Sequence, residues 1–130
     1  MSPDDRTTHD ADIIAMARAS DDFRRVVMTG PLMQIVLMTI PPGEEIGEET
    51  HPDVDQMLFF VEGQGEAVLD DERFEVGPDR LVLVRSGVRH NFVNTGAQPL
   101  RLVTAYAPPE HPPGTVHDTK AEADEAEHDH

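Results

Sequence analysis

Four polar side chains of the types that bind divalent metals lie in the middle of the sequence. They are Glu49, His51, Gln56 and His90, and His90 follows His51 by 39 residues. In an extended segment, residues i and i+2 face the same side, so Glu49 and His51 are predicted to point at one place. Two imidazoles, one carboxylate and one amide oxygen suit Fe(II), Mn(II), Ni(II) or Zn(II). The chain therefore predicts one divalent transition metal held by these four side chains.

Each predicted ligand also has a structural interpretation. A single histidine among apolar residues is more often a satisfied core residue than a ligand. Gln56 opens a strand, where it could instead hydrogen-bond to a ligand. Glu49 could be an exposed member of the acidic run that includes residues 44, 45 and 48. Asp53 and Asp55 are expected to form the turn between the ligands, although one of them could replace Gln56.

The predicted ligands lie among short apolar runs that are rich in β-branched residues. About eight such runs are separated by Gly, Pro and Asp turns, and they cover residues 23–29, 32–40, 56–62, 66–69, 73–76, 81–84, 88–93 and 100–105. This pattern predicts an all-β fold, an antiparallel sandwich or barrel. Along the third run, Gln56, Leu58 and Phe60 share one face, so the amide would point into an apolar interior.

The two ends of the chain differ from this central domain. Residues 1–22 form an N-terminal segment with a short helix expected over 11–19 and Asp10 as its N-cap. The β domain is expected over 23–107, followed by an acidic C-terminal extension over 108–130 that is partly helical or flexible. One interpretation is a solvated tail that frays at its end. The other is a lid, in which residues 111–117 fold back and bring His117 to the site.

The residues around the predicted ligands resemble the two sequence motifs of the cupin superfamily. The first motif corresponds to residues 43–51 followed by Gln56 and Gly63, and the second to residues 85–94, which include His90. Three positions depart from the usual pattern. Glu49 stands where the first His is usual, Gln56 stands where Glu is usual, and Arg85 replaces the Pro of the second motif. The carboxylate has thus moved to the position of the first His, which leaves a donor set of two imidazoles, one carboxylate and one amide.

The resemblance implies a jelly-roll β-barrel and a homodimer, and it extends to a mannose-6-phosphate-isomerase-like subgroup through residues 51–56 and 108–117. It implies a metalloenzyme that performs Lewis-acid chemistry on a sugar or sugar acid, with Glu49 or His117 moving protons. Three alternatives remain open. They are an Fe-dependent dioxygenase, a non-catalytic metabolite sensor, and a structural cupin that has lost its metal.

Composition narrows the class of partner. The chain has 26 acidic and 10 basic residues and a formal net charge of −16, which repels nucleic acid and anionic lipid. It has no cysteine, so disulfides and thiolate metal sites are excluded. No apolar run of 18 residues is present, so neither a signal peptide nor a membrane span is expected, and the predicted location is the cytoplasm. A small molecule is the expected partner.

Overall fold

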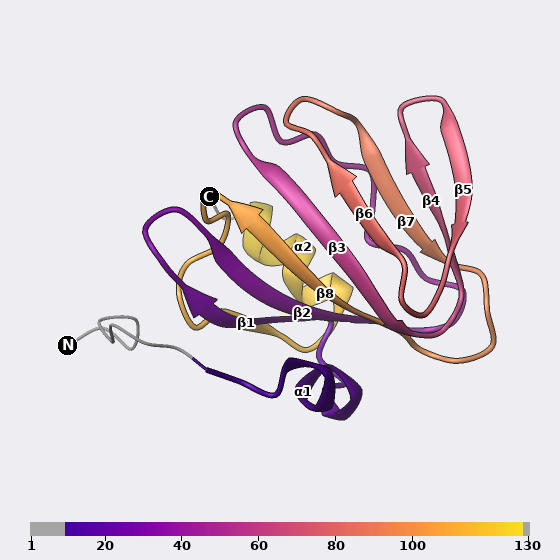
Figure 1. The fold of residues 1–130 in the computed structure, drawn as a ribbon, viewed down its shortest axis with the longest axis horizontal. Coiled ribbons are helices and arrows are strands. Elements are labelled where there is room, and N and C mark those ends of the chain that lie inside the picture. Colours follow the sequence, from indigo (N-terminus) through magenta and orange to yellow (C-terminus); the bar gives the residue numbers. More distant parts are fainter. Residues whose placement is uncertain (1–9, 129–130) are drawn as a thin grey trace.

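The computed structural model describes residues 10–128, which form two antiparallel β-sheets and two short helices (Figure 1). The large sheet has the strand order β6-β3-β8-β2-β1-β9, and the small sheet has the order β5-β4-β7. The elements are α1 (Ile13–Ala19), β1 (Arg24–Thr29), β2 (Gln34–Ile40), β3 (Asp55–Glu62), β4 (Gly65–Leu69), β5 (Glu72–Val76), β6 (Leu81–Val84), β7 (His90–Asn94), β8 (Leu100–Ala107), β9 (Val116–His117) and α2 (Lys120–His128). The predicted all-β jelly roll with short helices is confirmed, and its strands pair as two sheets rather than one closed barrel.

The apolar interior lies between the two sheets. Burial alternates along β3, where Leu58 and Phe60 are fully buried and Met57 is only partly buried. The Phe60 ring packs against Phe92 of β7 with 5.8 Å between ring centroids, which joins the large sheet to the small one. Alternation of this kind places every second residue of a strand in the core. Gln56 and His90 occupy such inward positions and are therefore buried among apolar side chains.

Helix α1 covers the outer face of the large sheet. Its N-cap is Asp12, whose side chain accepts a hydrogen bond from Ala15 N at 3.3 Å. The prediction of Asp10 as the cap is wrong, because the helix begins at Ile13 and not at residue 11. Ala17 is buried against Leu37 and Val103 in a second apolar cluster. Of the two described helices, neither is long and apolar enough to span a membrane.

The described part of the C-terminal extension, residues 108–128, folds back onto the large sheet. Strand β9 pairs with β1, and Val26 N donates to Thr115 O at 2.8 Å. Helix α2 places Ala123, which is 1% exposed, in the main core. The expectation of a solvated tail therefore does not describe residues 108–128, whereas residues 129–130 lie outside the described part. A two-residue strand such as β9 has no sequence period by which it could have been predicted.

An apolar surface lies at the β6 edge of the large sheet. Leu81 and Leu83 of β6 are 64% and 60% exposed, and they pair with Phe59 and Met57 of β3. Both strands alternate, so these four side chains share the outer face. We refer to Leu81, Leu83, Met57 and Phe59 as the β6 face.

Candidate metal centre

Glu49 and His90 are held directly opposite each other by the backbone. Glu49 N donates to His90 O, and His90 N donates to Glu49 O, each at 2.9 Å. In a hydrogen-bonded antiparallel pair of this kind the two side chains lie on the same face. His51, two residues further along, places its Nε2 atom 3.3 Å from Glu49 Oε2, and its ring centroid lies 5.2 Å from that of His90. Glu49, His51 and His90 are therefore neighbours in pairs.

His90 has the protonation state that a metal ligand requires. Its side chain is buried, and its Nδ1 atom lies 2.9 Å from the carbonyl oxygen of Val88. A carbonyl only accepts, so the ring proton is on Nδ1 and the lone pair is on Nε2. Burial lowers the pKa of His90, although the hydrogen bond to Val88 works in the opposite direction. The imidazole is therefore neutral near pH 7 and available to bind a cation through Nε2.

Gln56 presents a buried oxygen atom that lacks a hydrogen bond. The side chain is 3% exposed, and its Nε2 atom donates to Thr104 Oγ1 at 3.0 Å. The Thr104 hydroxyl in turn donates to Met57 O at 2.8 Å, so it must accept from the amide. Gln56 Oε1 is buried and has no hydrogen-bond partner. A buried carbonyl oxygen in this state is costly, and a bound cation would satisfy it.

The contacts of Tyr106 on β8 indicate that the Gln56 amide lies at the same end of the interior as the histidines. Tyr106 stands opposite Gln56 in the β3–β8 ladder, and its ring lies 6.1 Å from the His51 ring, edge to face. Gln56 is the strand partner of Tyr106 and His51 contacts its ring, so both residues lie near Tyr106. The four predicted ligands come from three separate segments, which only the folded sheets bring together.

This donor set fits a divalent metal ion. Two donor atoms bound at about 2.1 Å to one ion lie about 3.0 to 3.4 Å apart, and the His51 Nε2 to Glu49 Oε2 distance is 3.3 Å. Within residues 10–128, no group of three or more His, Asp and Glu side chains is arranged around one point. Glu49, His51 and His90 are therefore neighbours that are not gathered around one point in this structure, and binding of a metal would draw their side chains together. We infer that Glu49, His51, Gln56 and His90 would hold the metal.

Replacing Thr104 by Val is expected to weaken metal binding about tenfold while leaving the fold intact. Val fills nearly the same volume but cannot accept from Gln56 Nε2, so the amide is free to turn its NH₂ group toward the site. Affinity for Zn(II) would be measured by competition with a chromogenic chelator. Thr39→Val is the matched control, because the Thr39 hydroxyl donates to Ser20 O, away from the site. An unchanged affinity in Thr104→Val would show that Thr104 does not orient the amide.

Two further residues lie beside the predicted ligands, namely Glu110, which the sequence analysis did not single out, and His111, which belongs to the segment weighed as a lid. Glu110 Oε1 lies 3.4 Å from His51 Nδ1, and the hydrogen bond with His51 is the main cause of a lowered pKa of Glu110. The His111 ring lies 5.2 Å from the Tyr106 ring. Burial, with a smaller contribution from Arg24, lowers the pKa of His111 to about 3, so this imidazole is neutral.

The structure places the other candidates outside the donor set. His117 lies on β9, and its Nδ1 atom is 3.4 Å from Arg24 Nη1. Asp55 Oδ1 accepts a hydrogen bond from Ser86 N at 2.8 Å and so joins the start of β3 to the turn that follows β6. Asp53 is exposed in the turn between the ligands. Asp53 has the turn role expected of it, whereas Asp55 is the first residue of β3.

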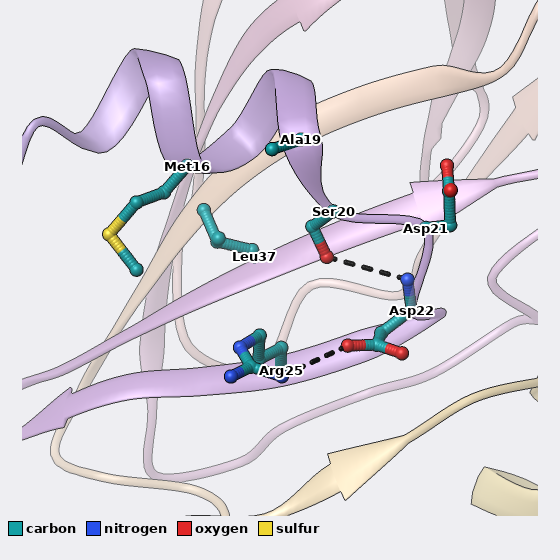
Figure 2. Close-up of a pocket in the computed structure, with 7 residues that line it drawn as sticks. All are labelled: Met16, Ala19, Ser20, Asp21, Asp22, Arg25 and Leu37. Atoms are coloured by element: carbon teal, nitrogen blue, oxygen red, sulfur yellow. Dashed lines mark hydrogen bonds and ion pairs between the residues drawn. The ribbon is translucent and has the colours of Figure 1, made fainter.

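A separate cavity of about 280 Å³ lies between α1 and strands β1 and β2 (Figure 2). Its lining residues are Met16, Ala19, Ser20, Asp21, Asp22, Arg25 and Leu37. Figure 2 shows two of its polar contacts, an ion pair of 3.2 Å between Arg25 and Asp22 and a hydrogen bond from Asp22 N to Ser20 Oγ. None of the predicted ligands lines this cavity, so it is distinct from the metal centre.

Two facing antiparallel sheets around an apolar interior define the class of protein. The family model described as Cupin domain matches residues 36–106, and the chain belongs to this family. The chain is 43% identical over 116 residues to the uncharacterized protein YrkC of Bacillus subtilis, which covers 85% of this chain and 62% of that protein. It is 34% identical over 96 residues to polyketide synthase CurC of Streptomyces cyaneus, covering 73% of this chain and 61% of that protein. The chain thus spans about three fifths of the length of these curated relatives.

A solved structure agrees with the fold over nearly the whole chain. The crystal structure of BH2720 from Bacillus halodurans is 39% identical in sequence and superposes with a TM-score of 0.91, covering 95% of this chain and 98% of that one.

Proposed function

We propose that this cupin is a metal-dependent enzyme that acts on a small, oxygen-rich metabolite through Lewis-acid chemistry. The observation that carries the proposal is the buried Gln56 oxygen without a hydrogen-bond partner, at the end of the interior where Glu49, His51 and His90 meet. Glu49, His51, Gln56 and His90 would hold the metal. When bound there, a divalent ion would polarise a substrate carbonyl or hydroxyl oxygen.

The protein's own residues supply orientation and proton transfer. Glu49 is the group proposed to move a proton, because its carboxylate lies 3.3 Å from His51 Nε2, beside the position proposed for the metal. The apolar side chains Leu58 and Phe60 exclude water from the interior beside Gln56. Exclusion of water strengthens electrostatic interactions with a bound substrate. His117, the other expected proton carrier, is held next to Arg24 on β9.

The proposed substrate carries two neighbouring oxygens that chelate a metal, as a sugar acid or a β-dicarbonyl compound does. The resemblance to the mannose-6-phosphate-isomerase-like subgroup supports a sugar or sugar acid. The similarity to polyketide synthase CurC supports a molecule with several carbonyl oxygens. A neutral amide donor leaves more positive charge on the metal than a second carboxylate would, which favours polarisation of a carbonyl.

Hydrogen–deuterium exchange at carbon tests this proposal. The protein loaded with Zn(II), Ni(II), Mn(II) or Fe(II) would be incubated in D₂O with uronic acids, aldoses and 1,3-diketones, and exchange next to the carbonyl would be followed by NMR. We expect metal-dependent exchange without uptake of O₂. Oxygen uptake with the Fe(II) form alone would favour the dioxygenase alternative. Tight binding of a compound without exchange or turnover would favour a sensor.

We also propose that two copies of the chain pair through the β6 face. Edge strands with exposed apolar side chains are natural association surfaces. Leu81→Lys with Leu83→Lys is expected to shift the protein from dimer to monomer in light scattering at micromolar concentration, because the new charges would be buried in the interface. The matched control is Leu32→Lys, another strongly exposed leucine outside this face. A parent protein that is monomeric would contradict the proposal.

A further inference from the structure

The C-terminal segment is fastened to the core next to the metal centre by one buried amide. Gln34 of β2 is fully buried, and its Nε2 atom donates to His111 O at 2.6 Å. Its Oε1 atom accepts from Glu110 N at 3.2 Å and from His111 N at 3.0 Å. Both hydrogen-bonding ends of the amide therefore hold the backbone of residues 110 and 111. Buried amides satisfied on both ends fix the position of the group that they bind.

This anchor directs the Glu110 carboxylate at His51. Glu110 Oε1 lies 3.4 Å from His51 Nδ1, on the opposite side of the ring from Glu49, whose Oε2 atom lies 3.3 Å from Nε2. The His51 ring is thus held between two carboxylates that contact its two nitrogens. Its side chain is only 12% exposed, so the ring has little room to turn.

We propose that Glu110 is a positioning residue for the metal centre, which keeps the His51 proton on Nδ1 and leaves Nε2 to bind the metal. The inference rests on the proposed metal site and adds a role for the C-terminal segment, which becomes part of the site rather than an appendage. A carboxylate that accepts from the far nitrogen of a ligating histidine fixes the tautomer and makes the imidazole a stronger donor. Glu110 itself does not bind the metal.

Because Glu110 belongs to the C-terminal segment, metal binding would depend on the folding of residues 108–128. The carboxylate reaches His51 only while Gln34 holds the backbone, β9 pairs with β1 and Ala123 packs in the core. A change that releases the segment would therefore weaken metal binding, although the segment contributes none of the four ligands.

Substitution of Glu110 tests this role with Co(II) as the probe, because its visible spectrum reports on coordination. Glu110→Ala is expected to weaken Co(II) binding by about 10- to 100-fold, and Glu110→Gln by less, since an amide oxygen still accepts from Nδ1. Both variants keep the backbone hydrogen bonds to Gln34, so thermal unfolding should confirm an intact fold. Glu125→Gln is the matched control, because it removes the same charge at an exposed position of α2 and should bind Co(II) as the parent does.

A second measurement reads the tautomer in the metal-free protein. The variant Glu49→Ala removes the carboxylate that competes at Nε2, and ¹⁵N NMR of its His51 imidazole should show the proton on Nδ1. Adding Glu110→Ala to that variant should shift the proton toward Nε2. Equal Co(II) affinity in the parent and in Glu110→Ala, or an unchanged His51 tautomer, would overturn the role of Glu110 alone. Failure of the parent to bind Co(II) would overturn the proposed metal site itself.

Discussion

The double variant His51→Ala, His90→Ala is expected to lose metal binding, with affinity reduced by more than about a hundredfold. Two of the four donors are removed, and the remaining carboxylate and amide are too few to hold a divalent ion against water. Bound metal would be quantified by mass spectrometry after purification without chelator and again after reconstitution. The parent should carry close to one equivalent and the variant almost none.

This result depends on a fold that survives the substitutions. His90 is buried, so its truncation should lower the free energy of unfolding by about 1 to 3 kcal/mol, which a domain of this size tolerates. Circular dichroism would verify that the strands remain. His117→Ala is the matched control, since it removes an imidazole that lies beside Arg24 on β9. Stoichiometric metal in the double variant, or its loss in the control, would contradict the assignment of the ligands.

Gly63→Ala is expected to lower the free energy of unfolding by about 2 to 4 kcal/mol. Gly63 has φ +91°, and a Cβ atom there would lie 2.5 Å from Pro99 O and 2.9 Å from Leu100 Cα. Both contacts are with backbone, so no side chain can move aside. The variant therefore combines an unfavourable backbone conformation with a steric clash at the turn between β3 and β4. Urea denaturation of parent and variant measures the loss.

Gly87→Ala separates the two causes. Gly87 has a similar φ of +86°, but a Cβ atom there would meet nothing within 4 Å. This control should lose only about 1 to 2 kcal/mol, the contribution of the left-handed conformation. Equal losses in the two variants would mean that the clash at Gly63 is relieved by backbone movement. A larger loss in Gly63→Ala would give a physical reason for the glycine at the end of the first cupin motif, which is Gly63 in this chain.

Most of the fold was predictable from the sequence because burial follows a period of two along each strand. The run 81–84 coincides with β6, and the run 100–105 lies within β8. Two features were not predictable. The first strand pairs with the two-residue strand β9, which has no periodic pattern, and the helix cap is Asp12 rather than Asp10 because several aspartates at the N-terminus offer equivalent signals.

The candidate ligands were identified from spacing, but their partners were not. The separation of two residues between Glu49 and His51 is sufficient to predict convergence, and the structure places their side chains 3.3 Å apart. Glu110 and Thr104 lie about 50 residues or more from the ligands that they contact, His51 and Gln56. No local pattern connects residues that far apart, because their proximity depends on how the strands pair.

Anomalous diffraction from a crystal grown with Zn(II) tests the metal site most directly. Data collected above and below the zinc absorption edge would locate the ion independently of any assumption about its ligands. We predict one strong peak about 2.0 to 2.2 Å from His51 Nε2, His90 Nε2, Glu49 and Gln56 Oε1. Zinc bound elsewhere on the protein, with no peak between these side chains and with His51 still paired to Glu49, would contradict the account.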